Sequence, residues 1–258
     1  MHSYRSVLIS VLFLAALTGC TRHKQARVSV PPPPAAQPGS QPENNPNNQP
    51  SPKPESVPSG HEPAGDANLS IPANAAVLST EVGKASWYGA PYHNRRTSSG
   101  EIYNMNAMTA AHRTFPLGSI VRVTNVKTGH TALVRITDRG PFVKGRVLDV
   151  SYAAAKLLDI WQPGIASVKI ELMQTPTSLT KGGRWAVQIG SFGSEKQASS
   201  LVDHLTRRYR SATVTKFLSP VGVWWVRVRV SNDERQRAET LAQETETGNA
   251  SVYVVRLD

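Results

Sequence analysis

Residues 120–137 read IVRVTNVKTGHTALVRIT, a pattern of two β-strands joined by a turn. Val121 and Val123 alternate with polar neighbours, which is typical of a strand with one buried face. A second β-forming run begins at Thr131, and residues 125–130 between them contain Gly129, which favours a tight loop. The stretch therefore predicts an antiparallel hairpin.

Further short β-rich runs flank this hairpin, each bounded by glycine or proline. They cover residues 84–88, 146–150 and 166–173. One helix is expected among them, with Ser151 as its N-cap and residues 153–158 as its body. Many short strands with one helix predict a small, mainly β barrel, which we place at residues 82–174.

The C-terminal part, residues 184–258, alternates between strands and helices after a short linker at residues 175–183. Strands are expected at residues 184–190, 212–217, 223–230 and 251–256, and helices at residues 194–209 and 231–246. Each helix begins with a Ser-x-x-Gln/Glu capping box, at Ser194 and at Ser231. The order βαββαβ predicts an α+β, ferredoxin-like sheet with both helices on one face.

Strand alternation separates the two faces of this sheet. The apolar side chains Val187, Ile189, Val228 and Val230 are expected to meet the helices. The opposite, open face then carries Gln188, Trp225, Arg227 and Arg229. These arginines suit the carboxylates of an acidic glycan; the alternative is a solvated basic face. An RNA-recognition module has the same topology, but its aromatic signature is missing.

The first residues are typical of an export signal. Arg5 is followed by an apolar run, residues 7–17, that is too short to span a membrane. The run ends in Leu17-Thr18-Gly19-Cys20, which resembles the bacterial lipobox. The resemblance implies cleavage of residues 1–19 and lipidation of Cys20, with Thr21 favouring the outer membrane; the alternative is an ordinary secretory signal with an incidental cysteine.

Residues 20–81 have the composition of a disordered tether. They hold 13 of the 19 prolines, many Asn, Gln and Ser residues, and no aromatic residue. Such a segment buries too little apolar surface to offset its chain entropy. Two functions are open for this segment: a tether from the membrane to the cell wall, or a spacer whose length does not matter.

The formal net charge of +11 favours an acidic partner: nucleic acid, anionic lipid or a carboxylate-bearing polymer. The basic residues are spread along the chain, with no helix-turn-helix or zinc-finger pattern, which argues against nucleic acid. The single cysteine excludes an intrachain disulfide and a multi-cysteine metal site. His93 and His112 are far apart in sequence, so no metal and no cofactor is expected.

Two carboxylates of the barrel, Glu101 and Asp138, lie beside glycine-containing turns. Carboxyl groups are the usual acid and base of glycosidic cleavage. Spacing alone is weak evidence, because Asp138 next to Arg139 also suits a structural turn or an ion pair.

A set of motifs in fixed order resembles the double-psi β-barrel of the rare lipoprotein A family. The motifs are Ala85–Gly89, Thr97–Glu101, Met108–His112, Pro116–Gly118, Val121–Asn125, Asp138–Phe142 and Gly145–Ser151. Related barrels occur in expansins and in family-45-type endoglucanases. The resemblance implies lytic cleavage of peptidoglycan glycan strands, with the acidic pair on Glu101 and Asp138 and a nearby histidine at His112.

The implied mechanism needs no water. One carboxylic acid, expected to be Asp138, protonates the oxygen between N-acetylmuramic acid and N-acetylglucosamine, and the muramic C6 hydroxyl attacks C1 to give a 1,6-anhydro end. Glu101 would act as base or charge stabiliser, and His112 would position one of them. Arg139 and the aromatic residues Tyr88 and Tyr92 are expected to bind sugar, with a core position equally open for Tyr88 and favoured for Trp87.

Residues 185–192 and 225–230 resemble the SPOR domain, in order, length and C-terminal position. That family binds glycan lacking stem peptides, which is enriched at division septa. The resemblance implies a lipid-anchored envelope protein at the septum, facing the periplasm. It does not indicate which proteins bind to it there. Other roles left open are a non-catalytic wall-binding protein and a hydrolase that uses water.

Four positions depart from these families. Asn104 stands where the barrel family often has Asp, and Asn94 where Gly is common. Ser231-Asn232 replaces a frequent Gly-Pro after the third SPOR strand, which puts the local loop shape in question.

Overall fold

The computed structural model describes residues 69–72, 74–245 and 251–258. The signal, Cys20 and almost all of the predicted tether lie outside the described residues. Within them, no helix combines the length and the apolar character that a membrane crossing requires.

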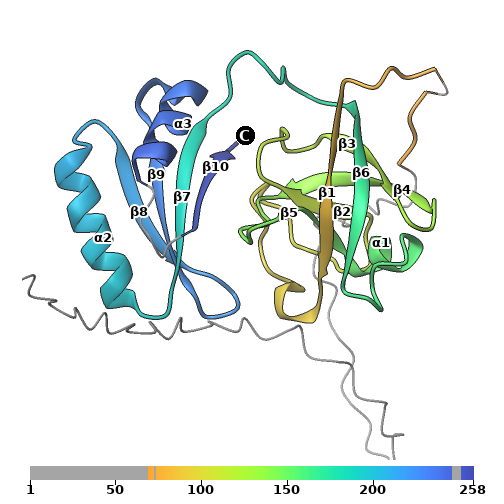
Figure 1. Ribbon diagram of the computed structural model, residues 1–258, viewed down its shortest axis with the longest axis horizontal. Helices are drawn as coiled ribbons and strands as arrows, with labels where there is room; N and C mark the ends of the chain where they lie inside the picture. Colours follow the sequence, from red (N-terminus) through yellow and green to blue (C-terminus); the bar gives the residue numbers. More distant parts are fainter. Residues whose placement is uncertain (1–68, 73, 246–250) are drawn as a thin grey trace, which may run out of the picture. The chain divides into compact units, whose positions relative to one another are not determined.

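Six strands form a closed barrel in the order β1-β5-β2-β4-β3-β6, which confirms the predicted mainly β, double-psi fold (Figure 1). Strands β1 and β5 and strands β2 and β4 are parallel, and the other neighbours are antiparallel. The strands are β1 (Ser79–Tyr88), β2 (Thr109–His112), β3 (Ile120–Asn125), β4 (Thr131–Asp138), β5 (Arg146–Ser151) and β6 (Ile165–Gln174). A 3-10 turn, η1, covers Ala90–Tyr92.

The hairpin of residues 120–137 is confirmed as strands β3 and β4, paired from Ile120–Arg135 to Thr124–Thr131. Its alternate residues Val121, Val123, Val134 and Ile136 are fully buried in the barrel core. The pleat therefore points the intervening polar residues of both strands away from the core.

Helix α1 (Tyr152–Leu157) begins where predicted, because Ser151 Oγ accepts a hydrogen bond from Ala154 N at 3.2 Å. Strand β2 was not predicted. Its sequence, Thr-Ala-Ala-His, lacks the β-branched alternation by which short strands are recognised, yet all four residues are buried between β4 and β5.

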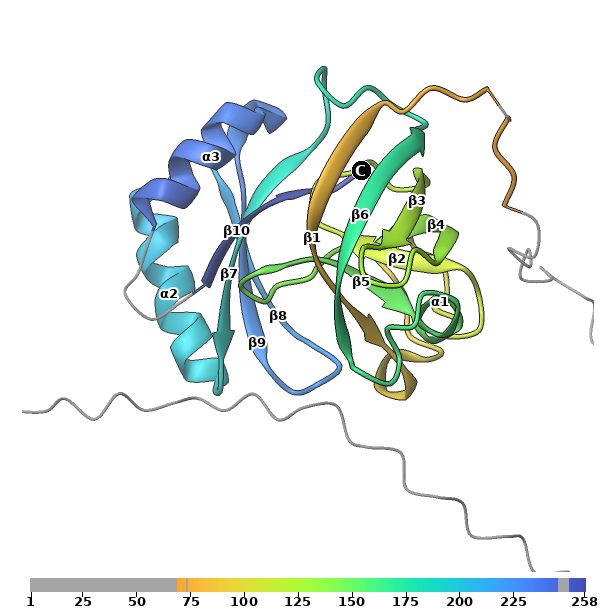
Figure 2. The same cartoon turned by 45° about the vertical axis from the view of Figure 1, so that its right-hand side comes forward.

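The C-terminal domain has the predicted βαββαβ order, with sheet order β10-β7-β9-β8 and helices α2 and α3 on one side (Figure 2). Its elements are β7 (Trp185–Phe192), α2 (Glu195–Arg208), β8 (Thr213–Leu218), β9 (Trp224–Arg229), η2 (Ser231–Asp233), α3 (Arg235–Glu244) and β10 (Ser251–Arg256). As expected, Val187, Ile189, Val228 and Val230 belong to the core formed with the helices.

The two predicted capping boxes differ in outcome. Ser194 Oγ accepts from Gln197 N at 3.4 Å and caps α2. The box at Ser231 is wrong, because α3 begins four residues later, at Arg235, without a side-chain cap. Asn232 and Asp233 take left-handed φ angles of 61° and 53°, which break the helix, and Ser231 Oγ donates to Ser211 O instead.

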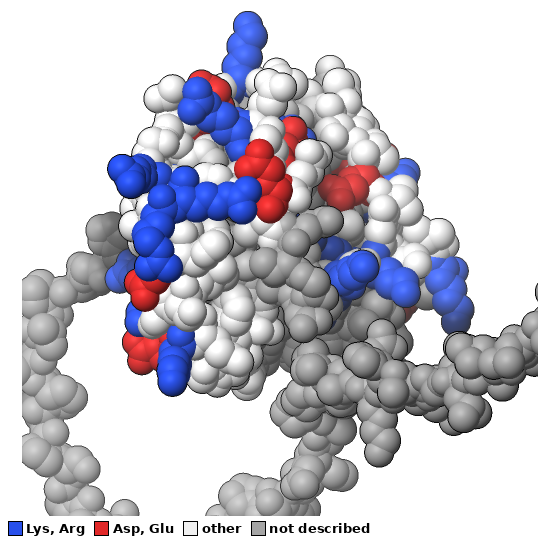
Figure 3. All heavy atoms as spheres, turned by 60° about the vertical axis from the view of Figure 1, so that its left-hand side comes forward, with Lys and Arg blue, Asp and Glu red and all other residues white. Residues whose placement is uncertain are grey.

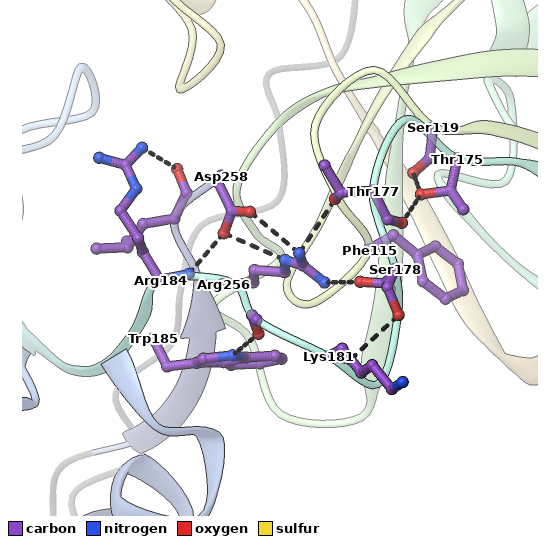
Figure 4. Close-up of polar contacts among 12 residues, drawn as sticks. Phe115, Ser119, Thr175, Thr177, Ser178, Lys181, Arg184, Trp185, Arg256 and Asp258 are labelled. Atoms are coloured by element: carbon purple, nitrogen blue, oxygen red, sulfur yellow. Dashed lines mark hydrogen bonds and ion pairs between the residues drawn. The ribbon is translucent and has the colours of Figure 1, made fainter. Parts of the chain in front are cut away.

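The segment before β7 is bound to the C-terminal domain by the buried side chain of Arg256 (Figure 4). Its guanidinium donates to Ser178 O at 2.8 Å and to Thr177 Oγ1 at 3.1 Å, and it pairs with Asp258 at 3.0 Å. Trp185 Nε1 donates to Gly182 O at 3.2 Å. These contacts fix the path of residues 177–182 along the domain.

Candidate active site

Asp138 lies at the end of β4, where one carboxylate oxygen is held by three donors. Oδ1 accepts from Ser98 N at 2.9 Å, from Ser98 Oγ at 2.6 Å and from Arg139 N at 2.8 Å. The side chain is half-buried. Neutral donors fix the orientation of this carboxylate without forming an ion pair with it.

Glu101 is carried by the same loop that binds Asp138. Ser99 N donates to Thr137 O at 3.0 Å, and Thr97 N donates to Glu101 O at 2.8 Å, so the loop is fastened to the end of β4. The structure thus brings the loop of Glu101 to the strand of Asp138.

The Glu101 carboxylate forms a bidentate ion pair with Arg135, with N–O distances of 2.6 and 2.9 Å. This pair holds the pKa of Glu101 below its ordinary value, and the side chain remains 48% exposed. Glu101 is therefore ionised at neutral pH, which suits a base or charge stabiliser and does not suit a proton donor.

His112 does not contact either carboxylate with its ring. It is buried and stacked on Phe115 at 3.9 Å, with Nε2 at 3.1 Å from Glu81 Oε2. Nδ1 accepts from Thr114 N at 3.2 Å and from Phe115 N at 3.0 Å, which places the proton of the neutral ring on Nε2.

Burial and Glu81 act in opposite directions on the pKa of His112. Burial lowers it and the Glu81 carboxylate raises it, and the burial effect is larger. His112 therefore stabilises the turn of residues 112–115 as a neutral ring. Its link to Asp138 is the backbone pairing of strands β2 and β4.

Arg139 was expected to bind substrate, but its side chain turns inward. It is buried, and Nη1 donates to His112 O at 3.0 Å and to Phe115 O at 2.7 Å. Burial lowers the pKa of Arg139 to about 10. This arrangement favours the structural alternative, in which Arg139 holds the same turn as His112.

The aromatic residues form a small cluster on the outside of the barrel. Tyr88 is 9% exposed, stacks on Tyr103 at 4.3 Å and meets the edge of Tyr92 at 5.8 Å. Tyr92 is half-buried, and Trp87 packs against the barrel core. The ring of Tyr88 is thus a packing residue, whereas the ring of Tyr92 remains partly exposed.

Asp149 on β5 was not singled out from the sequence. Its Oδ2 is 3.1 Å from Arg146 Nη2, while its Oδ1 is buried without a hydrogen-bond partner among the described residues. Burial raises the pKa of Asp149 to about 6. Nothing in the sequence pattern distinguishes Asp149, because it stands in an ordinary alternating strand.

The two barrel positions that depart from the family are accommodated locally. Asn94 has a φ angle of 61°, which explains why glycine is common there and why Asn is tolerated. Asn104 Oδ1 accepts from Asn106 N at 2.9 Å and closes a short turn.

In the C-terminal domain, Arg227 donates to Gln188 Oε1 at 2.7 and 3.1 Å and lies over the ring of Phe217 at 4.9 Å. Arg229 is paired with Asp233 at 2.7 Å, so part of its charge is already balanced. Gln188 and Trp225 are buried, so this face is not the open array that the sequence predicted.

Basic residues do not form one uninterrupted patch on the face that Figure 3 displays, where acidic side chains lie among them. Pairs such as Lys216–Glu195 at 2.8 Å and Arg237–Glu234 at 2.8 Å share the charge locally. No group of three His, Cys, Asp or Glu side chains within the described part of the chain is arranged to hold a metal ion.

Residues 80–170 match the model of a family described as lytic transglycolase, and residues 181–256 match the model of the SPOR domain. The endolytic peptidoglycan transglycosylase RlpA of Neisseria meningitidis serogroup A is 42% identical over 150 residues, 57% of this chain and 63% of the relative. The protein of that name from Vibrio cholerae is 43% identical over 133 residues, 49% of this chain and 51% of the relative.

In the Pseudomonas aeruginosa PAO1 protein of the same name, the match is 51% identical over 100 residues, 39% of this chain and 29% of the relative. The chain therefore spans less than two thirds of the length of these relatives. Among solved structures, the apo expansin of Clavibacter michiganensis aligns with 57% of this chain and 78% of its own, at 17% identity and a TM-score of 0.32.

Proposed function

We propose that this chain, a member of the rare lipoprotein A family with a lytic-transglycolase barrel and a SPOR domain, is an endolytic peptidoglycan lytic transglycosylase. Its substrate is the bond between N-acetylmuramic acid and N-acetylglucosamine in peptide-poor strands. Its product carries a 1,6-anhydro end.

The observation that carries this proposal is the fixed carboxylate of Asp138. Three neutral donors hold Oδ1, and the loop that supplies two of them also carries Glu101. A carboxylate with a fixed orientation is what a proton transfer at one glycosidic bond requires. The hydrogen bonds between Asp138 and Ser98 also tie the loop of Glu101 to strand β4.

The C-terminal domain is proposed to hold the barrel on peptide-poor glycan, with Arg227, which Gln188 orients, as the guanidinium group of its sheet. Guanidinium groups bind carboxylates through charge-assisted hydrogen bonds, and the lactyl groups of stripped glycan offer such carboxylates. We place the protein at the septum, lipidated at Cys20 and anchored in the outer membrane.

Digestion of purified sacculi, with and without prior amidase treatment, tests the activity. The wild-type protein is expected to release anhydro-ended fragments, mainly from amidase-treated sacculi, and Asp138→Asn to lower the release by about 10²- to 10⁴-fold. Reducing ends in place of anhydro ends would make it a hydrolase. Retained binding without any released fragment would make it a wall-binding protein.

The anchor is tested separately by Cys20→Ala. This variant is expected to leave the membrane fraction, because the acyl chains are lost. Continued membrane association in high salt would contradict the lipoprotein assignment.

A further inference from the structure

Asp149 lies in one row with Asp138 across the barrel. In the strand pairing, Asp149 of β5 is opposite Ala111 of β2, and Ala111 is opposite Asp138 of β4. Neighbouring strands are about 4.8 Å apart, so the two aspartate α-carbons are about 10 Å apart. The carboxyl groups of pairs that cleave glycosidic bonds lie about 5 to 10 Å apart, a separation that side chains on the same face of these two strands can span.

The alternation of β5 directs Asp149 out of the barrel. Its neighbours Leu148 and Val150 are fully buried in the barrel core, so the side chain between them points to the outer face. Ala111 faces the same side, because it packs with Tyr88 and Tyr103 outside that core. Asp149 therefore shares a face with the tyrosine cluster.

Electrostatics place both aspartates near this cluster. Burial raises the pKa of Tyr88 well above its ordinary value, and the charges of Asp138 and Asp149 both raise it further. Burial also raises the pKa of Tyr92, and the same two carboxylates add to that effect. The two acids thus approach the cluster from β4 and β5.

Several buried polar atoms around this row have no hydrogen-bond partner among the described residues. They are Asp149 Oδ1, Tyr88 Oη and Thr137 Oγ1. The hydroxyls of Tyr88 and Thr109 are neighbours but form no hydrogen bond of normal geometry. Buried polar groups in native proteins are nearly always paired, so this set marks an unusually polar region beside the two aspartates.

Resting on the proposed lytic activity, we infer that Asp149 is a catalytic carboxyl group that donates a proton to the glycosidic oxygen, with Asp138 as the base. Each carboxylate oxygen of Glu101 accepts a hydrogen bond from Arg135, and we assign Glu101 the charge-stabilising role. The side chain of Asp149 keeps an exposure of 15%, although Oδ1 itself is buried.

The step balances within the substrate and the two acids. The Asp149 proton moves to the glycosidic oxygen as the C1–O bond breaks. The muramic C6 oxygen forms the new bond to C1, and its proton moves to Asp138. Solvent then carries one proton from Asp138 to Asp149, and no water is consumed.

Asp149→Asn tests the inference on amidase-treated sacculi, with Asp159→Asn as the matched control. Asp159 is a barrel aspartate that pairs with His130 at 2.6 Å and is 45% exposed. We expect Asp149→Asn to lower the release of anhydro-ended fragments by about 10²- to 10⁴-fold. Its melting temperature should equal or exceed that of the wild type, because a buried amide loses less hydration than a carboxylate. The control should keep wild-type activity.

Asp149→Glu and the pH profile supply a second measurement. Wild-type activity should fall as pH rises through about 6, where Asp149 loses its proton, and Asp149→Glu should shift this limb. Full activity of Asp149→Asn, or a loss matched by unfolding, would overturn the inference while leaving the wild-type activity in place. A wild-type protein that releases nothing would instead remove the proposed function, and this inference with it.

Discussion

At the level of single residues, three carboxyl groups of the barrel differ in their surroundings and therefore in their chemical properties. Asp138 is held by neutral donors, Glu101 by a guanidinium group, and Asp149 by one arginine contact and burial. Burial raises the pKa of Asp149 to about 6, whereas the ion pair with Arg135 lowers the pKa of Glu101, so Asp149 keeps its proton to a higher pH than Glu101 does. Carboxylates in a sequence therefore do not reveal which one is the acid.

The buried ring of His112 makes the stability of the barrel depend on pH. Because its folded pKa lies below its unfolded value, the unfolded state binds more protons at mildly acidic pH. The stability contributed by the neutral ring is thus present above about pH 6.5 and is lost as pH falls towards the folded pKa. The slope from this group is at most about 1.4 kcal/mol per pH unit.

Urea unfolding between mildly alkaline and mildly acidic pH measures this effect. His112→Gln is expected to reduce the pH slope, and His204→Gln, at an exposed position, to leave it unchanged. An unaltered slope in His112→Gln would show that another group is responsible.

At the level of single elements, the sheet of the C-terminal domain depends on a glycine in β7. A Cβ atom on Gly190 would lie 2.3 Å from Cε3 of Trp225, its partner across the strands. Gly190→Ala must displace the indole ring and should destabilise the domain by about 1–3 kcal/mol.

Gly193→Ala is the matched control, since a Cβ atom there meets nothing within 4 Å. Tryptophan fluorescence during urea unfolding reports both variants. Equal midpoints for the two would mean that the Trp225 ring has room to move.

Elements with strong local signals were predictable from sequence. The β3–β4 hairpin, the Ser151 and Ser194 caps and the βαββαβ order follow from alternation and capping chemistry. Strand β2 was missed because its pairing with β4 and β5 stabilises a sequence without β-propensity. The Ser231 box failed because left-handed residues intervene, and a sequence pattern alone does not report such angles.

For the site, the sequence predicted the meeting of the Glu101 loop with Asp138, through the ordered motifs. It did not predict the inward turn of Arg139 or the burial of Asp149, since both depend on contacts distant in sequence. Arg139 binds main-chain oxygens near residue 112, and the environment of Asp149 comes from β1 and β2. Such contacts exist only once the barrel has closed.

For the whole molecule, wall binding should depend on salt and on Arg227. The Debye screening length falls to about 3 Å near 1 M salt, so the attraction between guanidinium groups and glycan carboxylates weakens. Arg227→Gln in the full chain should weaken binding to stripped glycan by about 10- to 100-fold, because a charge-assisted hydrogen bond contributes about 1.5–3 kcal/mol.

Arg237→Gln, which alters an arginine paired with Glu234 near the start of α3, is the control and should bind as the wild type does. Pull-down of the protein by amidase-treated sacculi measures both variants. Equal loss in the two would indicate attraction by net charge without a defined site.

The pairing of β1 with β6 has a mechanical consequence. The chain enters the barrel at Ser79 and leaves it after Gln174, and Ser79 is paired with Leu172 at this same end. Force applied to the chain before Ser79 and after Gln174 would break the β1–β6 residue pairs one after another from this end. It would not load all the pairs at the same time. The third residue pair contains Glu81, the partner of His112, so stretching would separate Glu81 from the His112 ring early, while the rest of the barrel is still closed.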